Sequence, residues 1–353
     1  MKNLIIDRRV VRNNLRTVKE RAGGVEIYAD LSANAYGMGL IEIARLLRDE
    51  GIRSFAISDP GDADTLRGQG LTDERLMMLR STADPDELAK LIELGVICTI
   101  GSYEAAVALN GIAESRGVVA EAQIKIDTGL GRYGFMPTET EQIASIYKYL
   151  SSVAVVGTFT TFSASWKSRK VTFAQLDMFN FVLDKLTDMG FEPGLAHAYD
   201  SAALFKYEFD SMDAVRVGDA LSGRVPGKAI AGLTKVGYIE AGLEEVGWFP
   251  KGHTIGGEHG VKLNKPTKIA VMSVGYYHGF GVELTGGKPR FADMIRGVRR
   301  PGVKINGQRA RVIGDVGLMH TLADVTNIEC TAGDKAIMDV DPVNVKGLAR
   351  MYR

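Results

Sequence analysis

The chain is poor in cysteine, tryptophan and histidine, with only 2, 2 and 5 of these among its 353 residues. Cys98 and Cys330 lie far apart in apolar surroundings and lack metal-like spacing, so we expect both in the hydrophobic core. Four of the histidines lie in predicted loops of the second half: His253, His259, His278 and His320. Their spacing matches no zinc template, so no metal site is predicted.

A net charge is also absent, because 43 Lys and Arg residues balance 43 Asp and Glu residues. With no basic block that carries interleaved aromatics, nucleic acid is excluded as an expected partner. No apolar stretch is long enough to span a bilayer, and residues 1–8 lack the apolar run of a signal peptide. We therefore expect a cytoplasmic protein without a membrane partner.

What the chain does contain is a regular alternation of short apolar runs and amphipathic segments. The runs predict eight strands, at 25–31, 54–58, 76–79, 96–100, 122–127, 153–159, 195–199 and 214–217. Between them, helical spacing of apolar residues is clear at 103–115 and 173–189. Eight strands alternating with helices predict an α/β fold, a (β/α)₈ TIM barrel over residues 10–225.

From residue 226 the pattern changes to short runs rich in glycine, valine and isoleucine, which predict a mostly-β domain over residues 226–353. Asn306-Gly307 separates two such runs and is a strong hairpin signal. We expect residues 1–9 to contribute a strand to this domain. The length of the chain suits one barrel-sized domain and one smaller domain.

The stretch 25–39 carries the first candidate chemistry. Its apolar run enters a loop with two glycines and an asparagine, and an amphipathic helix follows. Ser32 and Tyr36 lie where the carboxyl end of the strand meets the loop. Ligands of α/β proteins bind at this edge, because loops can present polar groups that a packed sheet cannot.

Five segments, in the same order along the chain, resemble the alanine racemase family of fold-type III pyridoxal-phosphate enzymes. The segments are 33–39 (ANAYGMG), 125–135 (KIDTGLGRYGF), 197–203 (HAYDSAA), 215–221 (VRVGDAL) and 274–279 (VGYYHG). The resemblance implies a barrel followed by a β domain, amino-acid chemistry, pyridoxal phosphate and a homodimer. It also implies two catalytic groups: a lysine that holds the cofactor as an imine, and a tyrosine base from the partner subunit.

The sequence departs from this family at both catalytic groups. Ser32 stands where the resemblance implies the lysine, and a hydroxyl cannot form an imine. Gly257 stands where it implies the tyrosine. Thr161 replaces a histidine beside the cofactor ring, and Gly314, before Asp315, replaces a methionine near the substrate entrance. We therefore expect ordinary racemase activity to be absent.

The resemblance implies that the cofactor-anchoring residues are retained. Those of the phosphate are Tyr36, Ser201, Gly218 and Tyr276. Arg216 corresponds to an arginine that faces the pyridine nitrogen, and His197 to a histidine that supports it. Lys125 and Arg132 correspond to a pair beside the phenolic oxygen and the substrate carboxylate.

Structural roles compete with these assignments. Tyr36 and Ser201 are also suited to capping a loop or the start of a helix. Arg216 is costly to bury without a partner, so a buried ion pair with Asp219 or Asp127 is the alternative.

The loop 162–170 also needs an interpretation, because it follows a predicted strand and is basic with one tryptophan. In one interpretation Lys167 or Lys170 supplies the amine or the anion contact that Ser32 cannot. In the favoured interpretation the loop is a solvated basic segment.

Together these residues predict a divergent family member that binds pyridoxal phosphate, or a related phosphorylated or amino-acid ligand, without a covalent bond. One alternative is an enzyme with altered amino-acid chemistry, whose acid or base comes from a set of four: Glu258, His259, His278 and Asp315. Another is a non-catalytic partner subunit of an active enzyme, in a hetero-complex rather than a homodimer. An ordinary amino-acid racemase is the fallback.

Overall fold

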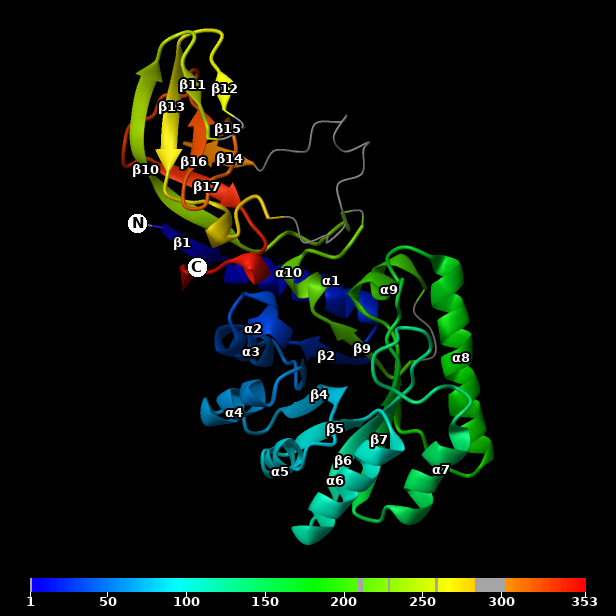
Figure 1. The fold of residues 1–353 in the computed structure, drawn as a ribbon. Coiled ribbons are helices and arrows are strands. Elements are labelled where there is room, and N and C mark those ends of the chain that lie inside the picture. The colour runs from blue at the N-terminus through cyan, green and yellow to red at the C-terminus, as the bar shows by residue number, and fades with distance from the viewer. Residues whose placement is uncertain (1, 209–211, 228, 258–259, 283–301) are drawn as a thin grey trace. The chain divides into compact units, whose positions relative to one another are not determined.

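The computed structural model describes residues 2–208, 212–227, 229–257, 260–282 and 302–353. The chain divides into two compact units. One is Val11–Thr234, which we call the barrel unit. The other combines Met1–Val10 with Lys235–Arg353, and we call it the β unit. Figure 1 shows the elements of both.

Eight parallel strands close a barrel in the barrel unit. In order they are β2 (Glu26–Asp30), β3 (Ser54–Ile57), β4 (Arg75–Ser81), β5 (Val96–Ile100), β6 (Ala120–Lys125), β7 (Val153–Phe159), β8 (Leu195–His197) and β9 (Ala214–Val217). The last strand pairs with the first, with Arg216 opposite Tyr28, so the sheet has no free edge. The (β/α)₈ barrel predicted from the sequence is confirmed.

Helices follow the strands and lie outside the barrel (Figure 1). They are α1 (Arg8–Ala22), α2 (Ser32–Tyr36), α3 (Leu40–Asp49), α4 (Pro60–Gly68), α5 (Pro85–Glu93), α6 (Tyr103–Ser115), α7 (Thr140–Tyr149), α8 (Arg169–Asp188), α9 (Ser201–Lys206) and α10 (Asp219–Ser222). Two of them begin with the same signal, Asp-Pro: the carboxylates of Asp59 and Asp84 accept backbone N–H groups of the first turn. Proline suits this first position because its missing N–H would have no helical partner.

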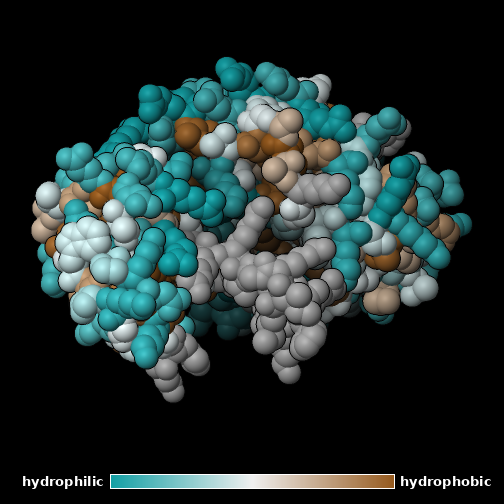
Figure 2. Space-filling view, turned by 90° about the horizontal axis from the view of Figure 1, so that it is seen from above, coloured by the Kyte–Doolittle hydropathy of each residue, from teal (hydrophilic) through white to brown (hydrophobic). Residues whose placement is uncertain are grey.

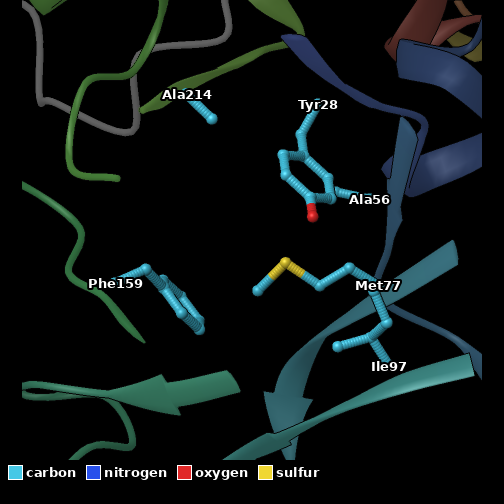
Figure 3. Close-up of a cluster of buried hydrophobic side chains, with 6 residues drawn as sticks. All are labelled: Tyr28, Ala56, Met77, Ile97, Phe159 and Ala214. Atoms are coloured by element: carbon cyan, nitrogen blue, oxygen red, sulfur yellow. The ribbon is translucent and has the colours of Figure 1, made fainter. Parts of the chain in front are cut away.

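The centre of the barrel is filled by side chains from six of its strands, which point toward one another in Figure 3. They are Tyr28, Ala56, Met77, Ile97, Phe159 and Ala214. Cys98 on β5 is buried too, and so is Cys330 in the β unit, which confirms the expectation that both lie in the core. A packed interior leaves the carboxyl ends of the strands as the surface on which polar side chains can gather.

The β unit is built around a sheet that closes through a pairing of β10 with β13. Its strands, in spatial order, are β13 (Thr267–Met272), β16 (Thr321–Asp324), β15 (Gln308–Ile313), β14 (Val303–Ile305), β17 (Lys335–Asp339), β10 (Tyr238–Phe249), β1 (Lys2–Ile6) and β18 (Ala349–Tyr352). A register shift between Leu243 and Glu245 lets the long strand β10 pair with β17 and β1 along one half and with β13 along the other. Strands β14 and β15 form the hairpin predicted at Asn306-Gly307. A short pair, β11 (Thr254–Ile255) with β12 (Val261–Lys262), completes the described strands.

Hydrophilic side chains predominate on the face of the molecule seen in Figure 2, and the hydrophobic ones form small groups. Among the helices of the described ranges, none combines the length and the hydropathy that a membrane crossing requires.

A buried asparagine ties α1 to the end of the barrel unit. Asn14 is fully buried; its Nδ2 donates to the carbonyls of Leu221 (3.0 Å) and Thr234 (2.8 Å), and its Oδ1 accepts the N–H of Thr234 (2.8 Å). We predict that Asn14→Ala lowers the free energy of unfolding by about 3 kcal/mol, because three backbone groups lose their partner. Urea denaturation measures it.

The matched control is Asn13→Ala, one residue earlier on the same helix, where the side chain is exposed. We expect it to change the free energy of unfolding by less than about 0.5 kcal/mol. Equal effects of the two substitutions would contradict the role assigned to Asn14.

Candidate functional site

The central group at the carboxyl end of the barrel is Arg216 on β9. Its guanidinium is buried and donates to Nδ1 of His197 (2.6 Å), to the carbonyl of Thr160 (2.6 Å) and to Oγ1 of Thr161 (3.1 Å). Since arginine only donates, Nδ1 of His197 is the acceptor and the proton of the ring lies on Nε2. Burial, and then the charge of Arg216, hold the pKa of His197 well below its usual range, so the ring is neutral.

A hydrogen-bonded chain through the barrel supports this pair. Nε2 of His197 contacts Oε1 of Gln123 (2.5 Å), and Nε2 of Gln123 donates to the hydroxyl of Tyr28 (3.2 Å). The imidazole also stacks between the rings of Tyr28 and Phe159, at centroid distances of 5.3 and 5.1 Å. Arg216 is therefore held from β6, β7, β8 and β2 at once.

The positive charge of Arg216 is compensated by carboxylates that are not hydrogen-bonded to it. Burial lowers its pKa to about 10, and the carboxylates of Asp200 and Asp30 act in the opposite direction. The guanidinium also lies over the ring of Phe159, 4.9 Å from its centroid. The sequence offered an ion pair between Arg216 and Asp127 as an alternative. The carboxylate of Asp127 instead accepts N–H groups of its own loop, at Gly129 and Gly131.

The loop after β2 is a left-handed turn. Four consecutive residues have positive φ: Ala33 (53°), Asn34 (60°), Ala35 (53°) and Tyr36 (54°). Such a conformation costs roughly 1–2 kcal/mol per residue for side chains with a Cβ. The turn is closed by a bond from the N–H of Ala35 to the carbonyl of Leu31 (2.7 Å), and Oδ1 of Asn34 accepts the N–H of Leu40 (2.7 Å).

The turn places Tyr36 against Gly218, which follows β9, and against Asp30 at the end of β2. The hydroxyl of Tyr36 donates to Asp30 (3.2 Å), whose other carboxylate oxygen accepts the N–H of Ser32 (2.9 Å). A Cβ on Gly218 would lie 2.2 Å from the Tyr36 ring, so this close approach requires glycine. Burial, followed by the charges of Asp30, Asp219 and Asp200, raises the pKa of Tyr36 well above its ordinary value, which keeps the phenol protonated.

Ser201 and Asp200 form a second polar layer beside Tyr36. Oγ of Ser201 accepts the N–H groups of Gly218 (3.2 Å) and Ala220 (3.1 Å). The carboxylate of Asp200 caps α9 by accepting the N–H of Ala203 (2.8 Å), and it accepts the hydroxyl of Ser165 (2.6 Å). Ser201 therefore has the capping role that the sequence left open as an alternative.

Lys125 lies at the end of β6. It is only 3% exposed; its Nζ donates to the carbonyl of Arg132 (2.7 Å) and lies 5.8 Å from the Phe159 ring centroid. Burial, and then the charges of Arg132 and Arg216, lower the pKa of Lys125 to about 8. The side chain of Arg132 is exposed.

Residues 6–226 match the family described as "Alanine racemase, N-terminal domain", and residues 236–351 match "Alanine racemase, C-terminal domain". The chain belongs to the alanine racemase family. An "Alanine racemase" of Methylacidiphilum infernorum is 32% identical over 337 residues, which are 94% of this chain and 82% of that protein.

Solved structures of the family agree with this fold. The alanine racemase of a D-cycloserine-producing Streptomyces lavendulae is 25% identical, with a TM-score of 0.87 and coverage of 100% of this chain and 97% of that one. An alanine racemase of Bartonella henselae was solved with covalently bound pyridoxal phosphate; it is 20% identical, with a TM-score of 0.83 and coverage of 100% and 99%. At 20% identity the likeness concerns the fold alone.

Of the residues that the resemblance to the alanine racemase family singled out, most of the retained ones lie in the barrel unit. The contacts above join Arg216 with His197, Tyr36 with Gly218, and Gly218 with Ser201. The histidine position of the family is occupied by Thr161, whose hydroxyl accepts from Arg216. In the loop 162–170 the side chains of Lys167 and Lys170 are exposed, as the solvated interpretation predicted.

The remaining candidates belong to the β unit and are described within it. Tyr276, in the short helix η1 (Tyr276–His278), is 52% exposed, and Gly257 and Asp315 are exposed as well. Both ring nitrogens of His278 are engaged, one by the N–H of Gly275 and one by Lys2. The other two proposed acid or base residues lie outside the described residues: Glu258 and His259.

Pyridoxal phosphate held covalently, as in the Bartonella henselae protein, does not fit the side chains of this barrel unit. Position 32 offers a hydroxyl that cannot form an imine. At the end that the resemblance assigns to the phosphate, Tyr36 donates to Asp30 and the amides of Gly218 and Ala220 donate to Ser201, so these three donors are already in use. Three carboxylates act on Tyr36 there, where a phosphate dianion needs donors.

Sequence reasoning missed several residues that shape this site. Asp30, Gln123 and Tyr28 were not singled out, and the positive φ of the turn at 33–36 was not foreseen. One signal was available: in the run 25–31 the odd positions are apolar, which places Tyr28 and Asp30 together on the other face of the strand.

Because the turn is strained, we predict that glycine stabilises it, whereas glycine destabilises an ordinary helix. In Ala33→Gly the relief of about 1–2 kcal/mol of left-handed strain exceeds the entropy gained by the unfolded chain. We therefore expect a free energy of unfolding that is higher than that of wild type by about 0.5 kcal/mol. The control Ala108→Gly, within α6, should lower it by about 1 kcal/mol. Urea titrations that give both variants the same sign would refute the strain assigned to Ala33.

The lowered pKa of Lys125 predicts a pH dependence of stability. Between about pH 8, its pKa in the folded protein, and 10.5, its ordinary value, the unfolded chain binds more protons than the folded one. Stability from this group therefore rises with pH across that window, by at most about 3 kcal/mol. Lys125→Met should abolish the rise. Denaturation of both proteins at pH 7.5 and pH 10 measures it, and parallel pH profiles would contradict it.

Proposed function

We propose that this member of the alanine racemase family binds a small amino-acid-like ligand at the carboxyl end of its barrel, without a covalent bond and without lysine-dependent racemisation. One observation carries the proposal. The residue at the imine position is Ser32, and its backbone N–H is bound to the carboxylate of Asp30. A serine hydroxyl neither forms an imine nor serves as an amine base.

The charges at the barrel end support an amino-acid-like ligand. Lys125 and Arg132 on the β6 side are cations that suit a carboxylate. The carboxylates on the β2 and β9 side, at Asp30 and Asp219, suit an ammonium group. A ligand with both charges is complementary to a surface that carries both signs.

These residues also allow a description of what the site does to such a ligand. The chain from Arg216 through His197 to Gln123 holds the guanidinium in one orientation, so the ligand meets a rigid cation. Tyr36 remains protonated and can offer only a hydrogen bond. The arrangement therefore binds and orients, and we assign no proton transfer to it.

Non-covalent binding of pyridoxal phosphate is the second candidate. It is favoured by Arg216, which the family resemblance places against a pyridine nitrogen, and by the neutral His197 behind it. The engaged donors at the phosphate end count against it. We also propose a homodimer as the assembly, on the family resemblance, and light scattering of the purified protein tests it against a hetero-complex.

The first experiment adds pyridoxal phosphate to the purified protein, reduces the mixture with borohydride and maps pyridoxyl-lysine by mass spectrometry. We expect no specifically labelled lysine in wild type, and a label at position 32 in Ser32→Lys, which restores the amine. Specific labelling of a native lysine would overturn the non-covalent claim. Lys167→Ala and Lys170→Ala then tell whether the basic loop supplies that lysine.

The second experiment measures alanine directly. We expect calorimetric titration of L-alanine or D-alanine to show binding that weakens about tenfold when one charged contact is lost in Lys125→Met. Circular dichroism of L-alanine incubated with the protein should show no conversion. Conversion to the D form at an ordinary enzymatic rate would refute the proposed function.

A further inference from the structure

The buried charge of Arg216 raises the question of what neutralises it. The hydrogen bonds of its guanidinium go to neutral groups: an imidazole nitrogen, two carbonyl oxygens and a hydroxyl. A buried cation with neutral partners is stable only if negative charge lies nearby. In a site built for an anionic ligand, the ligand supplies this negative charge.

In this barrel the negative charge comes from the protein itself. Asp200 and Asp30 are the two acidic residues that stabilise the charged form of Arg216. Both are fixed in place: Asp200 by Ser165 and the first turn of α9, and Asp30 by Tyr36 and the N–H of Ser32. Neither depends on a ligand to be held.

The third carboxylate, Asp219, directly follows Gly218 and begins α10. All three carboxylates lie close enough to Tyr36 for their charges to raise the pKa of its phenol. Tyr36 is in contact with Gly218, so this is the end of the site that the family resemblance assigns to a phosphate. The place where a dianion would bind therefore has negative neighbours, and the hydroxyl of Tyr36 and the amide of Gly218 already donate to other groups.

We propose that Asp30 and Asp200 are built-in counter-ions of Arg216, and that, together with Asp219 beside Gly218, they make this site select ligands without a phosphate. The inference rests on the proposed function, because it names the ligand class of the same site. The inference also goes beyond the proposed function, because it assigns the rejection of phosphate to these carboxylates and not only to the serine at position 32. Each like charge close to a dianion weakens its binding by about tenfold or more.

A matched pair of ligands isolates the phosphate. Pyridoxine and pyridoxine 5′-phosphate share the ring, lack an aldehyde that would react with surface lysines, and differ only in the phosphate. We expect calorimetric titration of the wild-type protein to show pyridoxine 5′-phosphate binding no more tightly than pyridoxine.

The test variant combines Asp30→Asn, Asp200→Asn and Asp219→Asn. Asparagine keeps one acceptor oxygen at each site and remains a good helix cap, so at Asp200 the bond from the N–H of Ala203 can be preserved, while the second acceptor oxygen is replaced by an amide nitrogen. We expect its affinity for pyridoxine 5′-phosphate to rise about tenfold or more, and that for pyridoxine to change less than about threefold. Asp219→Asn alone, which leaves the described hydrogen bonds of Asp30 and Asp200 unaltered, should give part of the gain and covers the case in which the triple variant does not fold.

The control is Asp184→Asn, on the exposed surface of α8, which makes the same change of charge away from the site. It should leave both affinities unchanged. Tighter binding of the phosphate ester than of pyridoxine by wild type, or no gain in the asparagine variants, overturns the inference.

The titration separates this inference from the proposed function. If wild type binds neither ring compound nor alanine but the triple variant binds pyridoxine 5′-phosphate, the counter-ion inference stands and the proposed function fails. If wild type binds alanine and also prefers the phosphate ester, the proposed function stands and the inference fails.

Discussion

The hydrogen bond between Arg216 and His197 is the constraint around which the barrel end is arranged. A guanidinium enclosed in the barrel needs acceptors on several sides. The imidazole acceptor lies on β8, and a carbonyl and a hydroxyl follow the end of β7. The imidazole can accept only while it is neutral, and Gln123 secures the tautomer that leaves Nδ1 free to do so. Side chains in the interior of the barrel thus fix the position of the Arg216 guanidinium.

That cation also explains the acidity of its surroundings. The resemblance to the alanine racemase family implies an anionic cofactor at this end of the barrel. Here two carboxylates from β2 and α9 supply negative charge from fixed positions, so the site is electrostatically complete before a ligand arrives. Ser32 and the carboxylates are consistent with the proposed function, since a site that holds no covalent cofactor must balance Arg216 by other means.

The fold could be predicted from the sequence because it depends on pattern. Eight apolar runs at regular intervals specify a barrel, and Asn306-Gly307 specifies a hairpin, whatever the details of packing. The site could be predicted only in part. Motif resemblance found Arg216, His197 and Tyr36, but it could not find Gln123, which meets His197 through the barrel interior from 74 positions earlier in the chain.

Backbone geometry was a second limit. The alanines of the turn at 33–36 carry no sign of a left-handed conformation, because that conformation is imposed by the hydrogen bonds around them. Asp30 lies in a predicted strand, where alternation shows its face but not that it holds both Ser32 and Tyr36.

The way in which Ser32 is anchored has a consequence for how this chain can change. Its attachment to Asp30 uses the main-chain amide, a group that every residue except proline possesses. The side chain at position 32 takes no part in this bond, so any residue with a main-chain N–H can form it. Chemistry and architecture are separable at this position, because a change of side chain alters the reactive group and leaves the bond to Asp30 available.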